Sequence, residues 1–66
     1  MIDARGFSCP QPVFMLMESM KSGDTYYEIM VDNHAAKENV SRFATSKDFN
    51  VEVEDKGNEY LIKVKK

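Results

Sequence analysis

The chain has 66 residues, 42% of them hydrophobic, and a formal net charge of −2. This length allows one domain spanning residues 1–66 and leaves no room for an enclosed substrate cavity, so a carrier or docking module is expected rather than a self-sufficient enzyme. The mixed, slightly acidic charge excludes the basic surface that direct binding of nucleic acid requires.

The chain begins with a predicted strand over residues 1–5. Apolar and charged residues alternate in it, which is typical of a strand with one buried face. Gly6 ends the strand. The two faces consist of Ile2 and Ala4 on one side and Asp3 and Arg5 on the other.

A helix is predicted over residues 10–21, with Gly23 after its end. Proline suits the first turn of a helix, so Pro10 and Pro12 place Cys9 near the N-cap. Apolar residues recur in this helix at positions i, i+3, i+4 and i+7. The core stripe predicted from this spacing consists of Val13, Leu16, Met17 and Met20.

The rest of the chain predicts a strand, a helix and a hairpin. Tyr26–Val31 alternates as a strand, and Asp32 or Asn33 caps a helix that extends to about residue 47. Two further strands, at Val51–Asp55 and Tyr60–Lys65, are joined by a turn. The turn lies around Lys56-Gly57-Asn58, and the expected buried residues are Tyr27, Ile29, Val31, Ala36, Val40, Phe43, Ala44, Val51, Val53, Tyr60, Ile62 and Val64.

Charged residues on the outer surfaces predict two sets of ion pairs. Glu38 and Arg42 are spaced i,i+4 in the favourable order on the second helix. Carboxylates and amines are also placed to meet across the last two strands. These are Glu52 and Glu54 on one strand and Lys63 and Lys65 on the other.

The element order βαβαββ predicts an α+β fold, a two-layer α/β sandwich. Right-handed crossovers place both helices on one face of a mixed four-stranded sheet. The strands that precede the helices are expected to be parallel, so both helices begin at the same edge of the sheet, where ligand sites tend to form. Cys9 and His34 are therefore expected near that edge.

The stretch Gly6–Pro12 contains the only cysteine and both prolines of the chain. A helix N-terminus favours the thiolate and lowers the pKa of a thiol by under about one unit. Such activation suits the acceptance and transfer of a group, and the flanking prolines favour a rigid, exposed Cys9. The alternative is that Cys9 is a small residue that only shapes a turn.

The single cysteine excludes several other kinds of chemistry. No disulfide can form within the chain, and a dithiol redox enzyme would need a resolving cysteine. Cys9 and His34 fall short of four zinc ligands, so neither a metal nor a bound cofactor is expected. A catalytic Cys9–His34 pair would need hydrogen-bond contact, and a solvated histidine is favoured over it.

A lone thiol and the absence of an apolar leader or spanning segment favour the cytoplasm, away from membranes.

Several exposed side chains near Cys9 predict a surface for protein partners. Phe14 and Met15 fall outside the core stripe of the first helix, and methionine adapts to different partners. The full candidate surface consists of Phe7, Phe14, Met15, His34 and Lys37. Arg5 and Lys37 either make this edge electropositive or are ordinary surface charges.

The pattern Asp3-x-Arg5-Gly6-x-x-Cys9-Pro10-x-Pro12 in this element order resembles the TusA/SirA-like sulfur-carrier family. The resemblance covers essentially the whole chain, with Phe7 where members commonly have leucine. Residues 32–44 are similar to YedF-type members, which are proposed to act in selenium metabolism and usually carry a second, DsrE-like domain. By that resemblance, the 66 residues correspond to an N-terminal domain.

The resemblance implies a sulfurtransferase-like carrier that holds a persulfide on Cys9 as transient cargo. Sulfur, or selenium, would come from a donor protein such as a cysteine desulfurase and pass to an acceptor protein. The chain is expected to act as a monomer. The supporting residues are Asp3, Arg5, Gly6, Pro10 and Pro12. The alternative function is a non-catalytic regulatory or interaction module in which Cys9 is structural.

Overall fold

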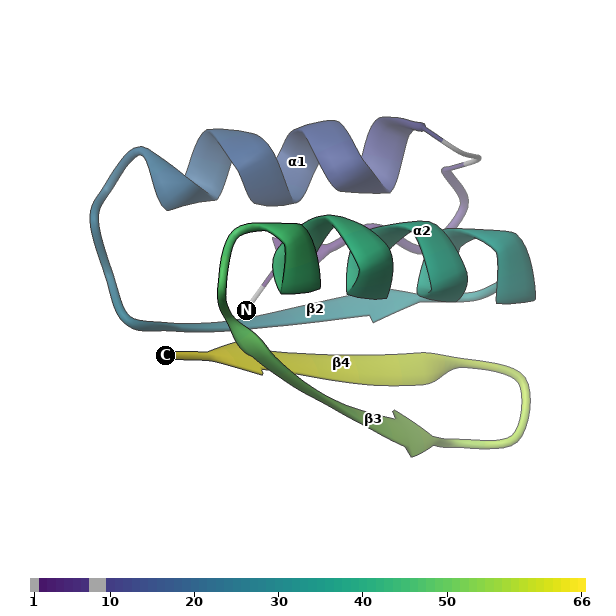
Figure 1. The fold of residues 1–66 in the computed structure, drawn as a ribbon. Helices are drawn as coiled ribbons and strands as arrows, with labels where there is room; N and C mark the ends of the chain where they lie inside the picture. Colours follow the sequence, from purple (N-terminus) through teal and green to yellow (C-terminus); the bar gives the residue numbers. More distant parts are fainter. Residues whose placement is uncertain (1, 8–9) are drawn as a thin grey trace.

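A computed structural model describes residues 2–7 and 10–66 of the chain as a four-stranded sheet with two helices. Both helices lie over the same face of the sheet (Figure 1). The predicted α+β two-layer sandwich is therefore confirmed. The elements are β1 (Ile2–Asp3), α1 (Gln11–Met20), β2 (Tyr26–Val31), α2 (His34–Ser46), β3 (Asn50–Asp55) and β4 (Tyr60–Lys65).

The sheet is mixed, with the strand order β1-β2-β4-β3. β1 and β2 are parallel, with Ile2 opposite Ile29, whereas β4 is antiparallel to both β2 and β3. Because β1 and β2 are parallel and each leads into a helix, the starts of α1 and α2 lie at one end of the molecule, together with the β3–β4 hairpin (Figure 1).

The core lies between the sheet and the two helices. β2 buries every second residue, as its alternating sequence predicts. In α2 the buried residues recur every four positions, which is the spacing of one helix face. The buried hydrophobic residues are Ala4, Leu16, Tyr27, Ile29, Val31, Ala36, Val40, Ala44, Ile62 and Val64.

The buried face of α1 differs from the predicted stripe. Met17, expected in the core, is 42% exposed, whereas Met15, expected outside, is partly buried against the core. The reason is that Pro12 is buried together with Leu16, one helical turn further on. These two residues set the centre of the buried face, so Met15 turns inward and Met17 outward.

The helix starts refine the predicted boundaries. α1 begins at Gln11, one residue later than predicted, and Pro10 is its N-cap residue, whose carbonyl accepts a hydrogen bond from the Phe14 N–H at 3.2 Å. In α2 the N-cap is Asn33, whose Oδ1 accepts from the Ala36 N–H at 2.8 Å. Of the two residues predicted to cap α2, Asn33 is therefore the one that does.

The predicted ion pairs form only in part. Glu38 contacts Nε2 of His34 at 3.2 Å rather than Arg42, because the side chain one turn earlier is also within reach. Lys63 pairs with Glu54 across the strands, as predicted. Glu52 lies directly opposite Lys63 in the sheet, and Lys65 lies opposite Asn50.

No helix in the described part of the chain is long and apolar enough to cross a membrane.

Candidate functional site

A tight turn links β1 to the segment that contains Cys9. The Ala4 N–H donates to the Met30 carbonyl at 2.8 Å and extends the pairing with β2, and Ala4 is fully buried. The Phe7 N–H then donates to the Ala4 carbonyl at 3.3 Å. Gly6 is the third residue of this turn and has a φ of +86°, as a type II turn requires.

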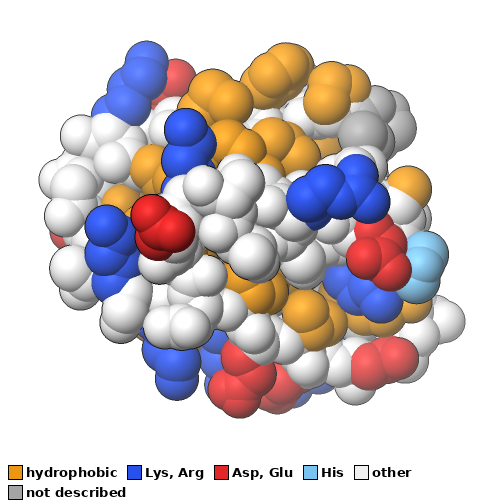
Figure 2. Space-filling view, in the orientation of Figure 1, with side chains coloured by type: hydrophobic (Ala, Val, Ile, Leu, Met, Phe, Trp, Pro, Cys, Tyr) orange, Lys and Arg blue, Asp and Glu red, His pale blue; other side chains and the backbone are white. Residues whose placement is uncertain are grey.

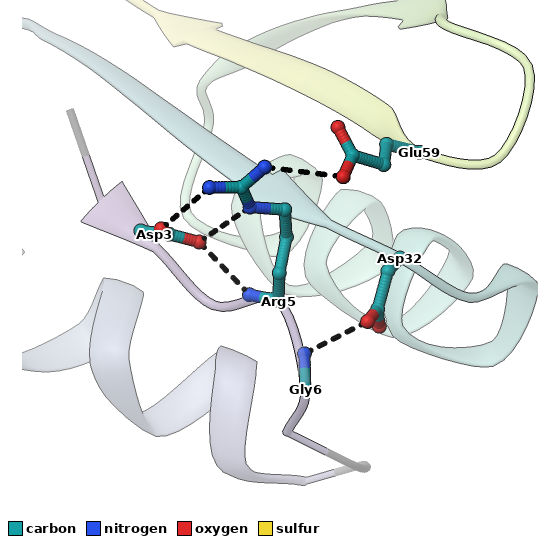
Figure 3. A network of polar contacts seen from close by, with 5 residues as sticks. All are labelled: Asp3, Arg5, Gly6, Asp32 and Glu59. Atoms are coloured by element: carbon teal, nitrogen blue, oxygen red, sulfur yellow. Dashed lines mark hydrogen bonds and ion pairs between the residues drawn. The ribbon is translucent and has the colours of Figure 1, made fainter.

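Asp32 binds this turn from a different part of the chain. Its Oδ2 accepts a hydrogen bond from the Gly6 N–H at 2.8 Å (Figure 3). Its Oδ1 accepts from the side-chain amide of Asn33 at 3.2 Å. Because Asn33 caps α2, the carboxylate connects the turn before Cys9 to the first turn of α2.

Arg5 connects β1 to the β3–β4 hairpin. Its Nε and Nη2 donate to the two oxygens of Asp3, each at 2.9 Å, and its backbone N–H donates to Asp3 Oδ1 at 3.1 Å. Its Nη1 donates to Glu59 Oε2 at 3.1 Å, just before β4 begins (Figure 3). We call Asp3, Arg5, Gly6, Asp32 and Glu59 the loop network.

The ion pairs of the loop network shift two pKa values. The guanidinium of Arg5, followed by the Arg5 backbone N–H, lowers the pKa of Asp3 to about 2 by hydrogen bonding to the carboxylate. The carboxylates of Asp3 and Glu59 in turn raise the pKa of Arg5 above its ordinary value. Two carboxylates, those of Asp3 and Glu59, pair with the single guanidinium of Arg5. Arg5 is therefore engaged in ion pairs and is not an unpaired positive charge at this edge.

The structure brings part of the predicted site together. Asp3, Arg5 and Gly6 belong to the loop network, Pro10 is the N-cap of α1, and Pro12 is buried in its first turn. Cys9 itself lies outside the described residues, so the structure does not test whether it contacts His34, a pairing that the sequence disfavours. The side chain of His34 is 67% exposed at the start of α2, where it contacts Glu38.

The residues of the candidate partner surface differ in how far they are exposed. Phe7 and Phe14 are 45% and 52% exposed, and Figure 2 shows hydrophobic side chains gathered over α1. Met15 is partly buried against the core, whereas Met17, which was not expected on this surface, is exposed on α1. Lys37 extends over the ring of Tyr60, with its Nζ 5.1 Å from the ring centroid.

Sequence reasoning missed Asp32 and Glu59 as members of the loop network. The sequence predicts Asp32 only as a possible cap for α2, and its position directly after β2 is the one signal that it faces the loop after β1. No local pattern indicates the contact of Glu59 with Arg5. Among the residues that the structure describes, no group of three or more His, Cys, Asp or Glu side chains is arranged to hold a metal ion.

Comparison with known proteins places the whole chain in one family. The fold is shared with the crystal structure of a SirA-like protein from Desulfitobacterium hafniense, with a TM-score of 0.84 and 24% sequence identity over 97% of this chain and 92% of that one. No curated protein matches the sequence. The family profile described as Sulfurtransferase TusA matches residues 1–66. The chain therefore belongs to the TusA sulfurtransferase family.

Proposed function

We propose that this protein is a sulfur carrier in which Cys9 takes a sulfane sulfur from a donor protein and passes it to an acceptor protein. The observation that carries the proposal is the match to the TusA family over residues 1–66. The position of the chain's only cysteine, directly before Pro10-Gln11-Pro12 and α1, supports it.

The proposed transfer consists of two exchange steps with balanced chemistry. The Cys9 thiolate attacks the terminal sulfur of a persulfide on the donor protein. A cysteine desulfurase is a suitable donor. The S–S bond of the donor breaks, an S–S bond forms on Cys9, and the donor cysteine leaves as a thiolate. A thiolate of the acceptor then attacks the terminal sulfur on Cys9 in the same way. No external oxidant or reductant is needed, because the sulfur moves at an unchanged oxidation level.

The composition and fold of the chain suit these steps. Because these 66 residues contain one cysteine, no second thiol within them can discharge the persulfide. Cys9 precedes the N-cap residue of α1, and a helix N-terminus favours a thiolate by up to about 1 kcal/mol. A reducing compartment such as the cytoplasm keeps a single thiol available.

Exposed apolar residues on α1 and in the loop before it suit protein partners. Phe7, Phe14 and Met17 are all exposed, and aromatic and methionine side chains are common in protein interfaces. A monomeric carrier with such a surface can meet a donor and an acceptor in turn. Selenium is a second cargo compatible with this chemistry, because a selenium atom can take the place of the terminal sulfur.

The first prediction is that Cys9 is loaded by a desulfurase. Incubation of the chain with a cysteine desulfurase and cysteine is expected to add the mass of one sulfur atom, and dithiothreitol is expected to remove it. Intact-mass spectrometry measures this change, and addition of selenocysteine with a suitable lyase tests for selenium.

Cys9→Ser is the matched control and is expected to gain no mass. Failure of the native chain to gain sulfur, or an equal gain by Cys9→Ser, contradicts the proposal. If Cys9→Ser also keeps full partner binding and full function in cells, the alternative of a regulatory or interaction module in which Cys9 is structural is supported instead.

A further inference from the structure

We propose that Asp32 is a positioning residue for Cys9, because its carboxylate holds the turn through which the chain reaches the cysteine. This inference rests on the proposed function, because the positioned thiol is the group that takes up sulfur in it. It also predicts the reactivity of the Cys9 thiol, which is measured without any sulfur donor.

The first argument is the hydrogen bond that Asp32 accepts. In the turn Ala4–Phe7, the Phe7 N–H bonds to the Ala4 carbonyl, which leaves the N–H of the third residue without a partner inside the turn. That residue is Gly6, and its N–H donates to Asp32 Oδ2 at 2.8 Å. The turn and the carboxylate lie 26 positions apart in the sequence, so the bond ties two separate loops together (Figure 3).

The second argument is that the Asp32 carboxylate is itself held in place. Asp32 follows Val31, a fully buried residue at the end of an inner strand of the sheet. Its Oδ1 accepts from the Asn33 side chain, whose own oxygen accepts from the Ala36 N–H in the first turn of α2. Asp32 directly follows β2, and its side chain is hydrogen-bonded to the cap residue of α2, so it provides a defined anchor for Gly6.

The third argument is the position of this anchor along the chain. Gly6 lies three residues before Cys9, and Pro10 directly follows Cys9 as the N-cap residue of α1. Among the described residues that flank this position, Pro10 is therefore held by α1 and the turn Ala4–Phe7 is held by Asp32. Loss of the Gly6–Asp32 bond removes the anchor of the turn on the N-terminal side. Because thiolate stabilisation and the geometry of attack both depend on placement, we expect reactivity to fall.

The experiment compares Asp32→Ala with Asp32→Asn in the full chain. Both substitutions remove the same negative charge, but asparagine keeps an acceptor oxygen for the Gly6 N–H, whereas alanine has none. A difference between the two variants therefore measures the hydrogen bond and not the charge. Asp55→Ala is the matched control, because Asp55 Oδ1 accepts from the N–H of Gly57, another glycine with positive φ, at the same 2.8 Å.

Two measurements are made on each variant. The rate of alkylation by iodoacetamide as a function of pH gives the pKa of the thiol, and it reports on Cys9 because the chain has no other cysteine. The rate of sulfur uptake from a cysteine desulfurase gives kcat and KM for the carrier. Circular dichroism verifies folding, and Asp32→Ser replaces Asp32→Ala if the latter does not fold.

We expect Asp32→Ala to raise the pKa of the Cys9 thiol by up to about half a unit relative to Asp32→Asn. We also expect it to lower kcat for sulfur uptake by about tenfold, with a smaller effect on KM. Asp55→Ala is expected to behave like the native chain in both measurements.

Equal thiol pKa values and equal uptake rates in Asp32→Ala and Asp32→Asn overturn the inference, as does an equal effect of Asp55→Ala. If the native chain takes up no sulfur at all, the proposed function fails. The comparison of thiol pKa values then still decides whether Asp32 positions Cys9, so the two failures are distinguishable.

Discussion

At the scale of single residues, Gly6 shows most directly how backbone conformation supports the site. Its φ of +86° is unfavourable for every residue with a Cβ, but a Cβ added there would meet no atom within 4 Å. The cost of a side chain at Gly6 is therefore conformational and not steric. Gly57 in the β3–β4 hairpin has the same two properties, with a φ of +95°.

Gly6→Ala is expected to lower the free energy of unfolding by about 1–2 kcal/mol, because alanine in the left-handed region is strained by about that amount. Gly57→Ala is expected to cost about the same. Urea unfolding followed by circular dichroism measures both values. A Gly6→Ala variant as stable as the native chain contradicts the positive φ, whereas a cost well above that of Gly57→Ala indicates that the bond to Asp32 is lost as well.

At the scale of elements, α1 shows where periodicity stops being informative. Residues 13–17 are all apolar, so the spacing fits more than one buried face, and the predicted face was rotated toward Met17. The packing of Pro12 and Leu16 decides between these faces, and that packing depends on the sheet beneath. The strict alternation of β2 and β4 predicts their buried faces correctly, as the full burial of Ile29, Ile62 and Val64 shows. The prediction was wrong for Val53, which is 39% exposed on β3, the strand at the edge of the sheet.

Leu16→Ala is expected to lower the free energy of unfolding by about 2–5 kcal/mol, because the leucine is fully buried and the change leaves a cavity. Met17→Ala, one position along and 42% exposed, is expected to change it by only about 0.5 kcal/mol. Denaturant unfolding of both variants distinguishes the two faces of α1. Equal losses of unfolding free energy would indicate that Met17 is buried in the core, which would contradict the structure.

At the scale of the whole molecule, long-range polar contacts are the part that the sequence could not predict. The order of elements and the parallel pairing of β1 with β2 were enough to predict that both helices begin at one end. The hydrogen bond from Gly6 to Asp32 and the ion pair of Arg5 with Glu59 join residues 26 and 54 positions apart. No local propensity or periodicity encodes such contacts, because they depend on side-chain directions in the assembled fold.

The ion pairs on the surface of the sheet predict how the folded state responds to acid. Arg5 lowers the pKa of Asp3 from 3.8 to about 2, and Lys63, with Lys56, lowers that of Glu54 from 4.5 to about 2. A carboxylate with a lowered pKa in the folded state stabilises that state fully above its unfolded pKa and loses this contribution as the pH falls through its folded pKa. Both contributions are therefore expected to be constant near neutral pH and to disappear between about pH 4.5 and pH 2.

Thermal unfolding followed by circular dichroism at stepped pH is expected to show a steady Tm down to about pH 5 and a decline below it. The double variant Asp3→Asn with Glu54→Gln is expected to start from a lower Tm and to decline less. High salt is expected to reduce the difference between the two proteins, because the pairs of both carboxylates are exposed and screened. An equal decline of Tm in the double variant would contradict this prediction. It would mean that other groups cause the loss of stability in acid and that these two ion pairs do not affect the stability of the whole molecule.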